Sequence, residues 1–153
     1  MKIAISADHR GAPVFEKVND AVRQAGHEVV PVPTCEAESC DYPEMAWAAG
    51  SAVADHRADR GVLICGSGIG MSMAANKIRG VRAALCHDEQ GAELSRRHND
   101  ANVICLSADS LPPEQIVAIV LRWLNSPFDG GRHARRIRKM EAIEDGRNPV
   151  QVS

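Results

Sequence analysis

A single cysteine stands directly before a loop of alternating glycines in the stretch LICGSGIGMS, residues 63–72. The cysteine is Cys65, and the loop that follows it consists of Gly66, Ser67, Gly68, Ile69 and Gly70. Backbone amides and a helix N-terminus carry partial positive charge, so they would stabilise a thiolate and an anion beside it. Such a site suits covalent catalysis or proton abstraction next to a carbonyl group. The alternative for Cys65 is a buried structural cysteine at the end of a strand.

The same glycines could instead cradle the phosphates of a nucleotide. The dinucleotide fingerprint needs another glycine where this chain has Met71, although Asp88 lies at a suitable distance for a ribose-binding acid. The loop follows the third predicted strand rather than the first, and a nucleotide gives no reason for the cysteine. The pattern therefore favours a reactive thiol, with nucleotide binding kept as an alternative.

Two further segments combine a histidine with polar neighbours. Asp8 and His9 follow the first predicted strand and could move protons between sugar hydroxyls, or Asp8 could cap the helix that begins near Gly11. His98 and Asn99 precede the fifth predicted strand, where they could handle hydroxyl protons or form an ordinary loop. Neither segment by itself distinguishes a proton-transfer role from a structural one.

A basic run near the end of the chain, GRHARRIRK, places Arg132 and Arg136 four residues apart. On a helix this spacing puts both guanidinium groups on one face, where they can clamp a phosphate. The alternatives are a solvated basic face and a nucleic-acid patch. A net charge of −2 and an aromatic content of 3% argue against nucleic acid.

The apolar pattern predicts five short strands, each followed by a helix. The predicted strands are 2–7, 27–32, 61–65, 81–86 and 102–107. The predicted helices are 12–25, 41–56, 69–77, 88–97, 112–125 and 131–145, followed by a loose tail at 146–153. The alternation indicates an α/β fold with a five-stranded parallel sheet and helices on both faces. The helix at 112–125 is apolar enough to be deeply buried or to pack in a subunit interface.

Ligands of open parallel sheets bind at the carboxyl ends of the strands. The first predicted strand ends in the polar segment 8–10, and the third ends in Cys65 and its loop. Segment 96–100 lies just before the fifth strand. We expect these three segments to gather on one edge of the sheet.

Length and composition predict one domain over residues 1–145 with a tail at 146–153, in a cytoplasmic protein without membrane or nucleic-acid partners. The sequence has no apolar run of membrane-spanning length and no secretory signal pattern. Cys86 and Cys105 are expected to be small buried hydrophobes. Cys35 and Cys40 lack the spacing of a zinc knuckle, so we expect no structural metal site.

Taken in order, these segments resemble the ribose-5-phosphate isomerase B family, which also includes the two galactose-6-phosphate isomerase subunits. The matching stretches run from about residue 1 to 145 and are ADHRG, DYP, LICGSGIGMSMAANKIRGVRAALC, SRRHNDANVI and GGRHARRI. The resemblance implies a Rossmann-like three-layer sandwich and a homodimer or homotetramer with shared active sites. It also implies an aldose–ketose isomerase of the pentose phosphate pathway that works through an enediolate without a metal or other cofactor.

The resemblance assigns roles residue by residue. Cys65 would be the base that moves a proton between C1 and C2, and Ser67 with the loop amides would hold the enediolate. Asp8 and His98 would assist ring opening and hydroxyl proton transfer. The residues expected to bind the sugar or its phosphate are His9, Tyr42, Gly66, Gly68, Ile69, Gly70, Asn99, Arg132 and Arg136, some of them from a partner subunit. The presence of Cys65 and His98 matches the cysteine–histidine type of the family rather than the type with serine and a glutamate base.

One position departs from the family. Many members carry a phosphate-binding arginine after the fifth strand, where this chain has Asp109 in LSADSLPPE. A carboxylate near a phosphate is repulsive, so either Asp109 points away, or phosphate binding is weaker, or the substrate is not ribose 5-phosphate. Arg10 is a candidate to compensate. The alternatives are another pentose phosphate, a hexose phosphate such as allose 6-phosphate or galactose 6-phosphate, and a non-catalytic sugar-phosphate or nucleotide-binding module.

Overall fold

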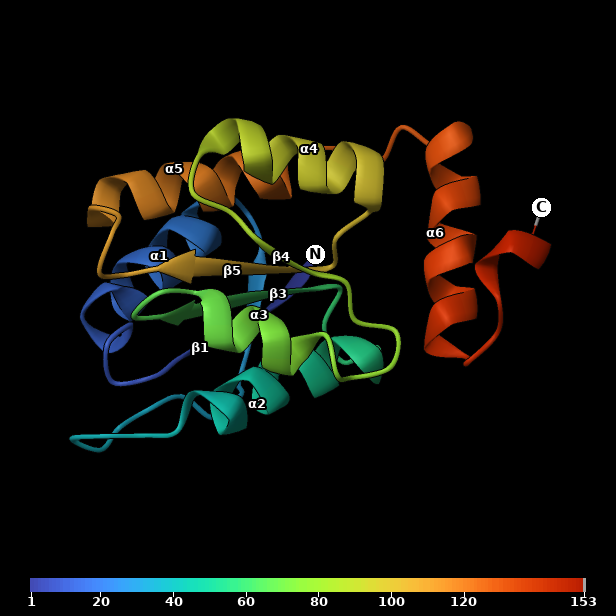
Figure 1. Cartoon of the computed structure of the whole chain (residues 1–153). Helices are drawn as coiled ribbons and strands as arrows, with labels where there is room; N and C mark the ends of the chain where they lie inside the picture. The colour runs from blue at the N-terminus through green and yellow to red at the C-terminus, as the bar shows by residue number, and fades with distance from the viewer. Residues whose placement is uncertain (153) are drawn as a thin grey trace.

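The computed structural model describes residues 1–152 and places a parallel β-sheet between two layers of helices (Figure 1). The strands are β1 (Lys2–Ala7), β2 (Glu28–Val30), β3 (Arg60–Cys65), β4 (Ala83–Leu85) and β5 (Val103–Ser107). All pairs are parallel and the order across the sheet is β2-β1-β3-β5-β4. The predicted α/β class and the three-layer arrangement are confirmed.

The helices cover the two faces of the sheet unequally. They are α1 (Ala12–Gln24), α2 (Tyr42–Ala54), α3 (Ile69–Ala75), α4 (Glu89–Asn99), α5 (Pro113–Leu124) and α6 (Arg132–Glu144). Helices α1, α4 and α5 share one apolar cluster with the sheet, and α2 and α3 share the other. Figure 1 shows α4 and α5 above the strands and α2 and α3 below them.

Helix α5 belongs to the core rather than to an exposed apolar surface. Ile116, Ile119 and Trp123 are fully buried among residues of the sheet and of α1. Two arginine side chains, Arg60 and Arg96, lie over the Trp123 ring at 5.4 and 6.0 Å. The apolar circumference of this helix therefore reflects burial, which was one of the two alternatives that the sequence left open.

Two strands are markedly shorter than predicted. The predicted strand 27–32 is shorter because Pro31 and Pro33 have no N–H to donate, and β2 pairs with β1 only from Glu28 to Val30. The predicted strand 81–86 narrows to β4, which follows a turn closed by the bond from Val81 N–H to the Ile78 carbonyl.

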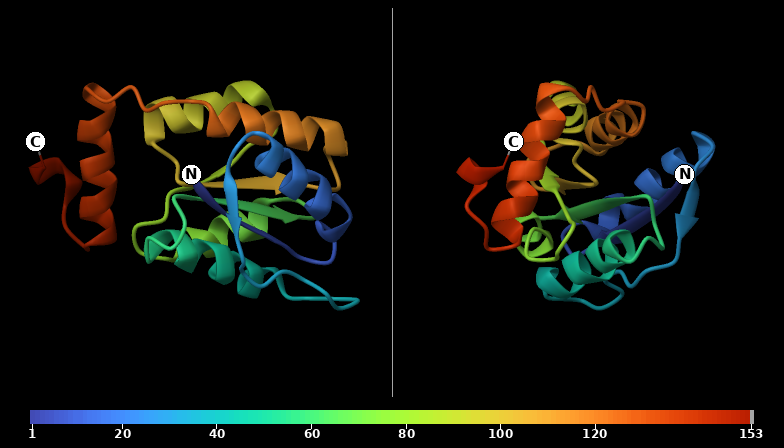
Figure 2. Two further views of the ribbon diagram at one scale, coloured as in Figure 1. Left: turned by 180° about the vertical axis from the view of Figure 1, so that it is seen from behind. Right: turned by 90° about the vertical axis from the view of Figure 1, so that its right-hand side faces the viewer.

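Helix α6 stands at one end of the sheet, beside the last turn of α4 (Figures 1 and 2). The chain after α6 was expected to be a loose tail, but Pro149–Gln151 forms a 3₁₀ helix that packs against α6. Lys139 of α6 donates to the Pro149 carbonyl at 3.0 Å. The prediction of a loose tail is therefore corrected for this turn, while residue 153 lies outside the described residues.

The five cysteines have different environments. Cys86 and Cys105 are buried, as predicted for small apolar residues. Cys65 also carries a free thiol, whereas Cys35 and Cys40, which received no role in the sequence analysis, form a disulfide. Within residues 1–152, each helix is too short or too polar to cross a lipid bilayer.

Candidate active site

The carboxyl ends of β1 and β3 form the point where the strand order reverses direction. From β1 the chain passes to β2 on one side and then to β3 on the other. The loops after two such strands diverge, and ligands of doubly wound sheets bind in the crevice between them. Asp8 follows β1 and Cys65 ends β3, and the Asp8 N–H donates to the Ile64 carbonyl at 3.2 Å. These residues therefore lie side by side at the expected binding crevice.

The Cys65 thiol is buried under the glycine loop. The Gly68 N–H donates to Cys65 Sγ at 3.1 Å. Burial raises the pKa of Cys65 above its ordinary value, whereas hydrogen bonds from the amides of Gly68, Met71 and Ser67 lower it. The nearby Asp8 carboxylate also raises the pKa of the Cys65 thiol. The expected stabilisation of a thiolate by backbone amides is present, but burial outweighs it.

The shape of the loop depends on Gly68 and on the end of β5. Gly68 has a φ of +75°, and a side chain there would meet Leu85 Cδ1 at 2.5 Å. The Ser107 hydroxyl donates to the Gly66 carbonyl at 2.6 Å, which ties the start of the loop to β5. Ser67 is exposed, and its hydroxyl accepts from the Ile69 N–H at 3.2 Å. The loop thus presents a hydroxyl outward and an amide inward to the thiol.

Asp8 stabilises the turn between β1 and α1. Its Oδ1 accepts from the backbone N–H groups of Arg10 and Gly11 at 2.9 and 3.0 Å. Both amides precede the helix and Gly11 is its N-cap residue, so Asp8 is not the helix cap that the sequence offered as an alternative. Within the described residues, Oδ2 has no hydrogen-bond partner, so one carboxylate oxygen remains available at the crevice beside Cys65.

Four other side chains lie around this crevice. His9 Nδ1 lies 3.3 Å from both the backbone nitrogen and the backbone oxygen of Cys40. The Tyr42 ring lies against Gly70, since a Cβ on that glycine would be 2.6 Å from two ring atoms. Arg10 donates to Asp109 Oδ1 from both Nε and an Nη atom, at 3.1 and 2.7 Å. Asp109 lies beside the loop, because a Cβ on Gly66 would be 2.9 Å from its Oδ2.

The second group of predicted site residues lies at the opposite edge of the sheet. His98 and Asn99 end α4 just before β5 begins, and Arg132 starts α6 beside them. The five steps of β3 from Arg60 to Cys65 separate the two edges by about 16 Å, at about 3.3 Å per residue. The prediction that all the polar segments gather on one edge is wrong. A segment that precedes a parallel strand lies at its amino end, whereas Cys65 lies at a carboxyl end.

At this opposite edge two histidines and two arginines form a positively charged surface. The His98 and His133 rings stack with their centroids 4.3 Å apart and their planes 1° apart. Burial, then the charges of His98, Arg132 and Arg136, lower the pKa of His133. Arg132 and Arg136 are exposed and, within residues 1–152, make no hydrogen bond or ion pair with the protein. Their guanidinium groups are therefore free to bind an anion.

This surface is poorly suited to a metal ion. In the described part of the chain, His98, Asp129 and His133 are the one group whose potential ligand atoms lie within 4.8 Å of one another. The Asp129 carboxylate is already engaged by Arg97 Nε at 3.1 Å. The nitrogen lone pairs of two stacked rings lie in parallel planes and do not converge on one point. The geometry and the neighbouring arginines favour an anion over a cation.

Some residues of these two surfaces received no role from the sequence. Arg97 of α4 pairs with Asp129, which lies in the segment between α5 and α6, and the Asp129 N–H also donates to the Arg97 carbonyl. His133 lies within the GGRH motif, which was the one available signal for it. The contact between His9 and the Cys40 backbone could not be predicted from the sequence. Any residue type has the same backbone atoms, so a backbone contact between residues 31 positions apart does not affect the side-chain pattern.

Comparisons with known proteins cover nearly the whole chain. The family model described as Ribose/Galactose Isomerase matches residues 3–140. Ribose-5-phosphate isomerase B of Escherichia coli K12 is 40% identical over 147 residues, covering 96% of this chain and 99% of that protein. The D-erythrulose-4-phosphate isomerase of Pectobacterium atrosepticum is 38% identical over 147 residues, covering 94% and 95% of the two chains. A solved structure of Clostridium thermocellum ribose-5-phosphate isomerase B has a TM-score of 0.92 and 41% identity, covering 95% and 99%.

Proposed function

The chain belongs to the ribose/galactose isomerase family, and we propose that its reaction interconverts ribose 5-phosphate and ribulose 5-phosphate through an enediolate. At the coarser level the chain is an aldose–ketose isomerase of sugar phosphates, rather than a binding module. The observation that carries the finer proposal is the buried Cys65 thiol, with an amide 3.1 Å from its sulfur and the Asp8 carboxylate beside it.

In the proposed reaction, the Cys65 thiolate removes the proton from C2 of the open-chain aldose and returns it to C1. The electron pair of the broken C–H bond forms the enediolate, whose charge needs nearby donors. Ser67 and the loop amides supply them, while Asp8 and His98 open the ring and move the hydroxyl proton. Deprotonation of Cys65 also turns its contact with the Gly68 N–H into a charge-assisted hydrogen bond.

The remaining binding residues divide between the two edges of the sheet. The Tyr42 ring lies against Gly70 of the glycine loop, and His9 lies beside Cys40 at the same edge, so we assign Tyr42 a contact with the sugar. Asn99, Arg132 and Arg136 lie at the other edge, where Asn99 would contact the sugar. We assign the phosphate to His9 and the two arginines, because an imidazole N–H and guanidinium groups can donate hydrogen bonds to an anionic ligand.

One chain cannot bring these two surfaces to one substrate, so we propose a homodimer or homotetramer with shared sites. A two-fold interface joins the same patch of both copies, so that one residue of the patch contacts a different residue of the partner and the reverse contact also occurs. One such contact therefore yields two equivalent sites. Apolar side chains that are exposed in the single chain support this assembly, with Trp47 64%, Met73 64% and Ile143 62% exposed. Trp47 and Ile143 also line a groove of about 1170 Å³ between α6 and the body of the protein.

The test is formation of ribulose 5-phosphate from ribose 5-phosphate, measured with and without a chelator. We expect activity that survives chelation and falls by at least about a hundredfold in Cys65→Ala, the lower range for loss of a general base. Cys86→Ala, which alters another buried free thiol that belongs to the apolar cluster on the other face of the sheet from Cys65, is the matched control and should retain activity. Robust turnover by Cys65→Ala would remove the thiol from the mechanism.

A different sugar phosphate is the second candidate, favoured by Asp109. This residue replaces the phosphate-binding arginine of many family members and lies beside Gly66. One relative that is 38% identical is named D-erythrulose-4-phosphate isomerase, for a substrate other than ribose 5-phosphate. A panel of four-, five- and six-carbon aldose and ketose phosphates, compared by kcat/KM, distinguishes the candidates. Preference for another member of the panel would reassign the substrate.

A further inference from the structure

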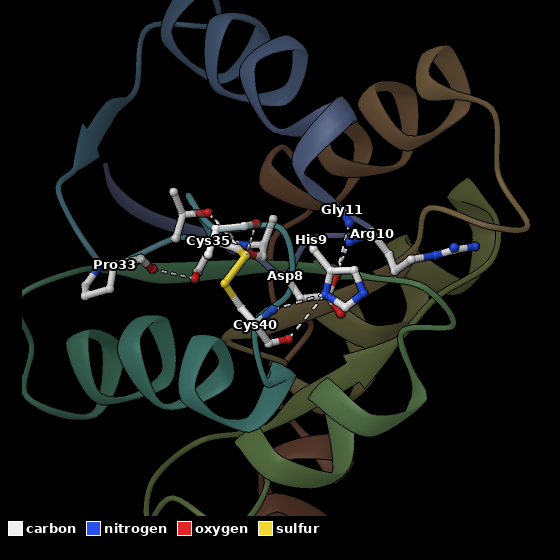
Figure 3. The surroundings of a disulfide bond; sticks show 11 residues. Asp8, His9, Arg10, Gly11, Pro33, Cys35 and Cys40 are labelled. Carbon is white, nitrogen blue, oxygen red and sulfur yellow. Dashed lines mark hydrogen bonds between the residues drawn. A yellow bond between two sulfur atoms is a disulfide. The ribbon is translucent and has the colours of Figure 1, made fainter.

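The Cys35–Cys40 disulfide lies beside the carboxyl end of β1, next to His9 (Figure 3). On one side it is attached to the strand through the segment from Pro33 to Cys35. The Cys35 N–H donates to the Ala7 carbonyl at 2.9 Å. The Ser6 hydroxyl donates to the Pro33 carbonyl at 2.6 Å. Cys35 is therefore fixed to the sheet by backbone and side-chain hydrogen bonds.

On its other side the disulfide holds the peptide that contacts His9. His9 Nδ1 lies 3.3 Å from the Cys40 nitrogen and 3.3 Å from the Cys40 oxygen. An unprotonated Nδ1 can accept from the Cys40 N–H, and a protonated Nδ1 can donate to the Cys40 carbonyl. The Cys40 peptide can thus orient the His9 ring in either state, which leaves Nε2 to meet a ligand.

The intervening residues give this peptide little other support. Residues 36–39 are exposed and belong to no helix or strand. A short covalent link removes conformational freedom that such a loop would otherwise have. Because Cys35 is held against β1, the disulfide restrains the backbone of Cys40, and the Cys40 backbone in turn restrains the His9 ring.

We propose that the Cys35–Cys40 disulfide is a positioning element for His9, so that its reduction by a dithiol weakens binding of the phosphorylated substrate. This inference rests on the proposed role of His9 in phosphate binding. A thiolate of the dithiol attacks one sulfur and the S–S bond breaks, leaving a mixed disulfide and one protein thiolate. The second dithiol sulfur displaces the other protein sulfur. Two protein thiols and an oxidised dithiol result, with two electrons and two protons transferred.

Kinetics on one polypeptide in two redox states test the proposal. The purified enzyme is assayed with ribose 5-phosphate as isolated, after dithiothreitol, and after reoxidation by glutathione disulfide, with the thiols counted by alkylation and mass spectrometry. We expect reduction to raise KM about three- to tenfold and to change kcat less than about twofold, as for loss of one binding contact. Reoxidation should restore KM.

Three variants show whether His9 mediates the effect. The double variant Cys35→Ser/Cys40→Ser should keep the high KM and not respond to dithiothreitol. Ser39→Ala, an exposed change in the same loop, should respond as the unchanged protein does. His9→Asn should have a raised KM that reduction does not raise further. An unchanged KM on reduction, or a response that persists in His9→Asn, overturns the proposal.

A measurement without turnover separates this inference from the proposed function. In protein carrying ¹⁵N-labelled histidine, the His9 ring signals, assigned with His9→Asn, should shift on reduction and return on reoxidation. If no ribose 5-phosphate is converted in either state, the proposed function fails, and the His9 signals alone decide the positioning. Ring signals that stay unchanged between the two states overturn it.

Discussion

Cys65 combines two opposing influences within a few ångströms. Burial and the Asp8 carboxylate favour the neutral thiol, whereas the backbone amides of Ser67, Gly68 and Met71 favour the thiolate. A base held in this balance is mostly protonated at neutral pH, since its pKa lies above the ordinary value of 9.0. The same burial makes the thiolate more basic once it forms, which suits removal of a proton from carbon.

The pH dependence of the reaction follows from this balance. In the proposed mechanism the thiolate is the reactive form. Because the pKa of the Cys65 thiol is raised, kcat/KM should then increase with pH across neutrality and continue to increase beyond 9.0. The profile is measured with ribose 5-phosphate from about pH 6 to about pH 10. The alkylation rate of Cys65 by iodoacetamide should follow the same curve. A plateau of both curves below pH 8 would contradict the raised pKa.

The Asp109 carboxylate lies at the crevice and is paired with a cationic side chain. It lies next to Gly66 and forms an ion pair with Arg10, whose side chain is 58% exposed while that of Asp109 is 46% exposed. Exposed pairs contribute little to stability, typically about 0–1 kcal/mol. The pair therefore matters more for charge at the crevice than for folding, because each charge offsets the other.

Removing the Asp109 charge should improve phosphate binding. Asp109→Asn leaves Arg10 without its partner and removes a repulsive carboxylate, so we expect KM for ribose 5-phosphate to fall about threefold. Asp109→Glu keeps the charge and serves as the control. Thermal unfolding of both variants checks that stability is preserved. An unmoved KM in Asp109→Asn would show that Asp109 does not face the phosphate.

At the scale of elements, the turn between β3 and α3 joins the core to the reactive thiol. Gly68 adopts a left-handed conformation in this turn, and its amide reaches Cys65. A side chain there would also approach the Leu106 carbonyl carbon at 3.1 Å. The geometry of the thiol contact therefore depends on a backbone conformation that glycine adopts without strain.

Gly68→Ala should affect both folding and activity. Strain at positive φ and the contact with Leu85 should lower the free energy of unfolding by about 1–3 kcal/mol, measured in urea. Activity should fall further than stability, because the amide moves away from Cys65. Gly80→Ala is the matched control, since Gly80 has a φ of +80° with no atom within 4 Å of the added Cβ. Equal losses of activity in the two variants would refute this assignment.

At the scale of the whole molecule, the two functional surfaces occupy opposite ends of one sheet (Figure 1). Cys65, Asp8 and His9 lie at the carboxyl end, and the arginines of α6 lie at the amino end. In the proposed mechanism each surface is incomplete by itself, because one supplies the base and the other supplies the two arginines that bind the phosphate. A second copy of the chain can supply each surface with the missing half.

Mixing two inactive variants tests this arrangement. Cys65→Ala and His98→Ala each destroy one half of every shared site, but a mixed dimer contains one site with neither substitution. Random exchange of equal amounts of the two variants should therefore recover about one quarter of the unchanged activity. The control mixes Cys65→Ala with Asp8→Ala, which lie on the same surface and should not complement each other. No recovery in the first mixture would contradict the shared site.

The alternation of strand and helix, and the chemistry at the ends of β1 and β3, were predictable from the sequence. Local apolar periodicity determines these elements, and the parallel arrangement places Asp8 beside Cys65. Only the tertiary structure placed His98 at the far edge, paired Asp109 with Arg10, and joined Cys35 to Cys40 beside His9. Those relations depend on strand direction and on contacts between segments distant along the chain, whereas periodicity reports only which face of its own element a residue occupies.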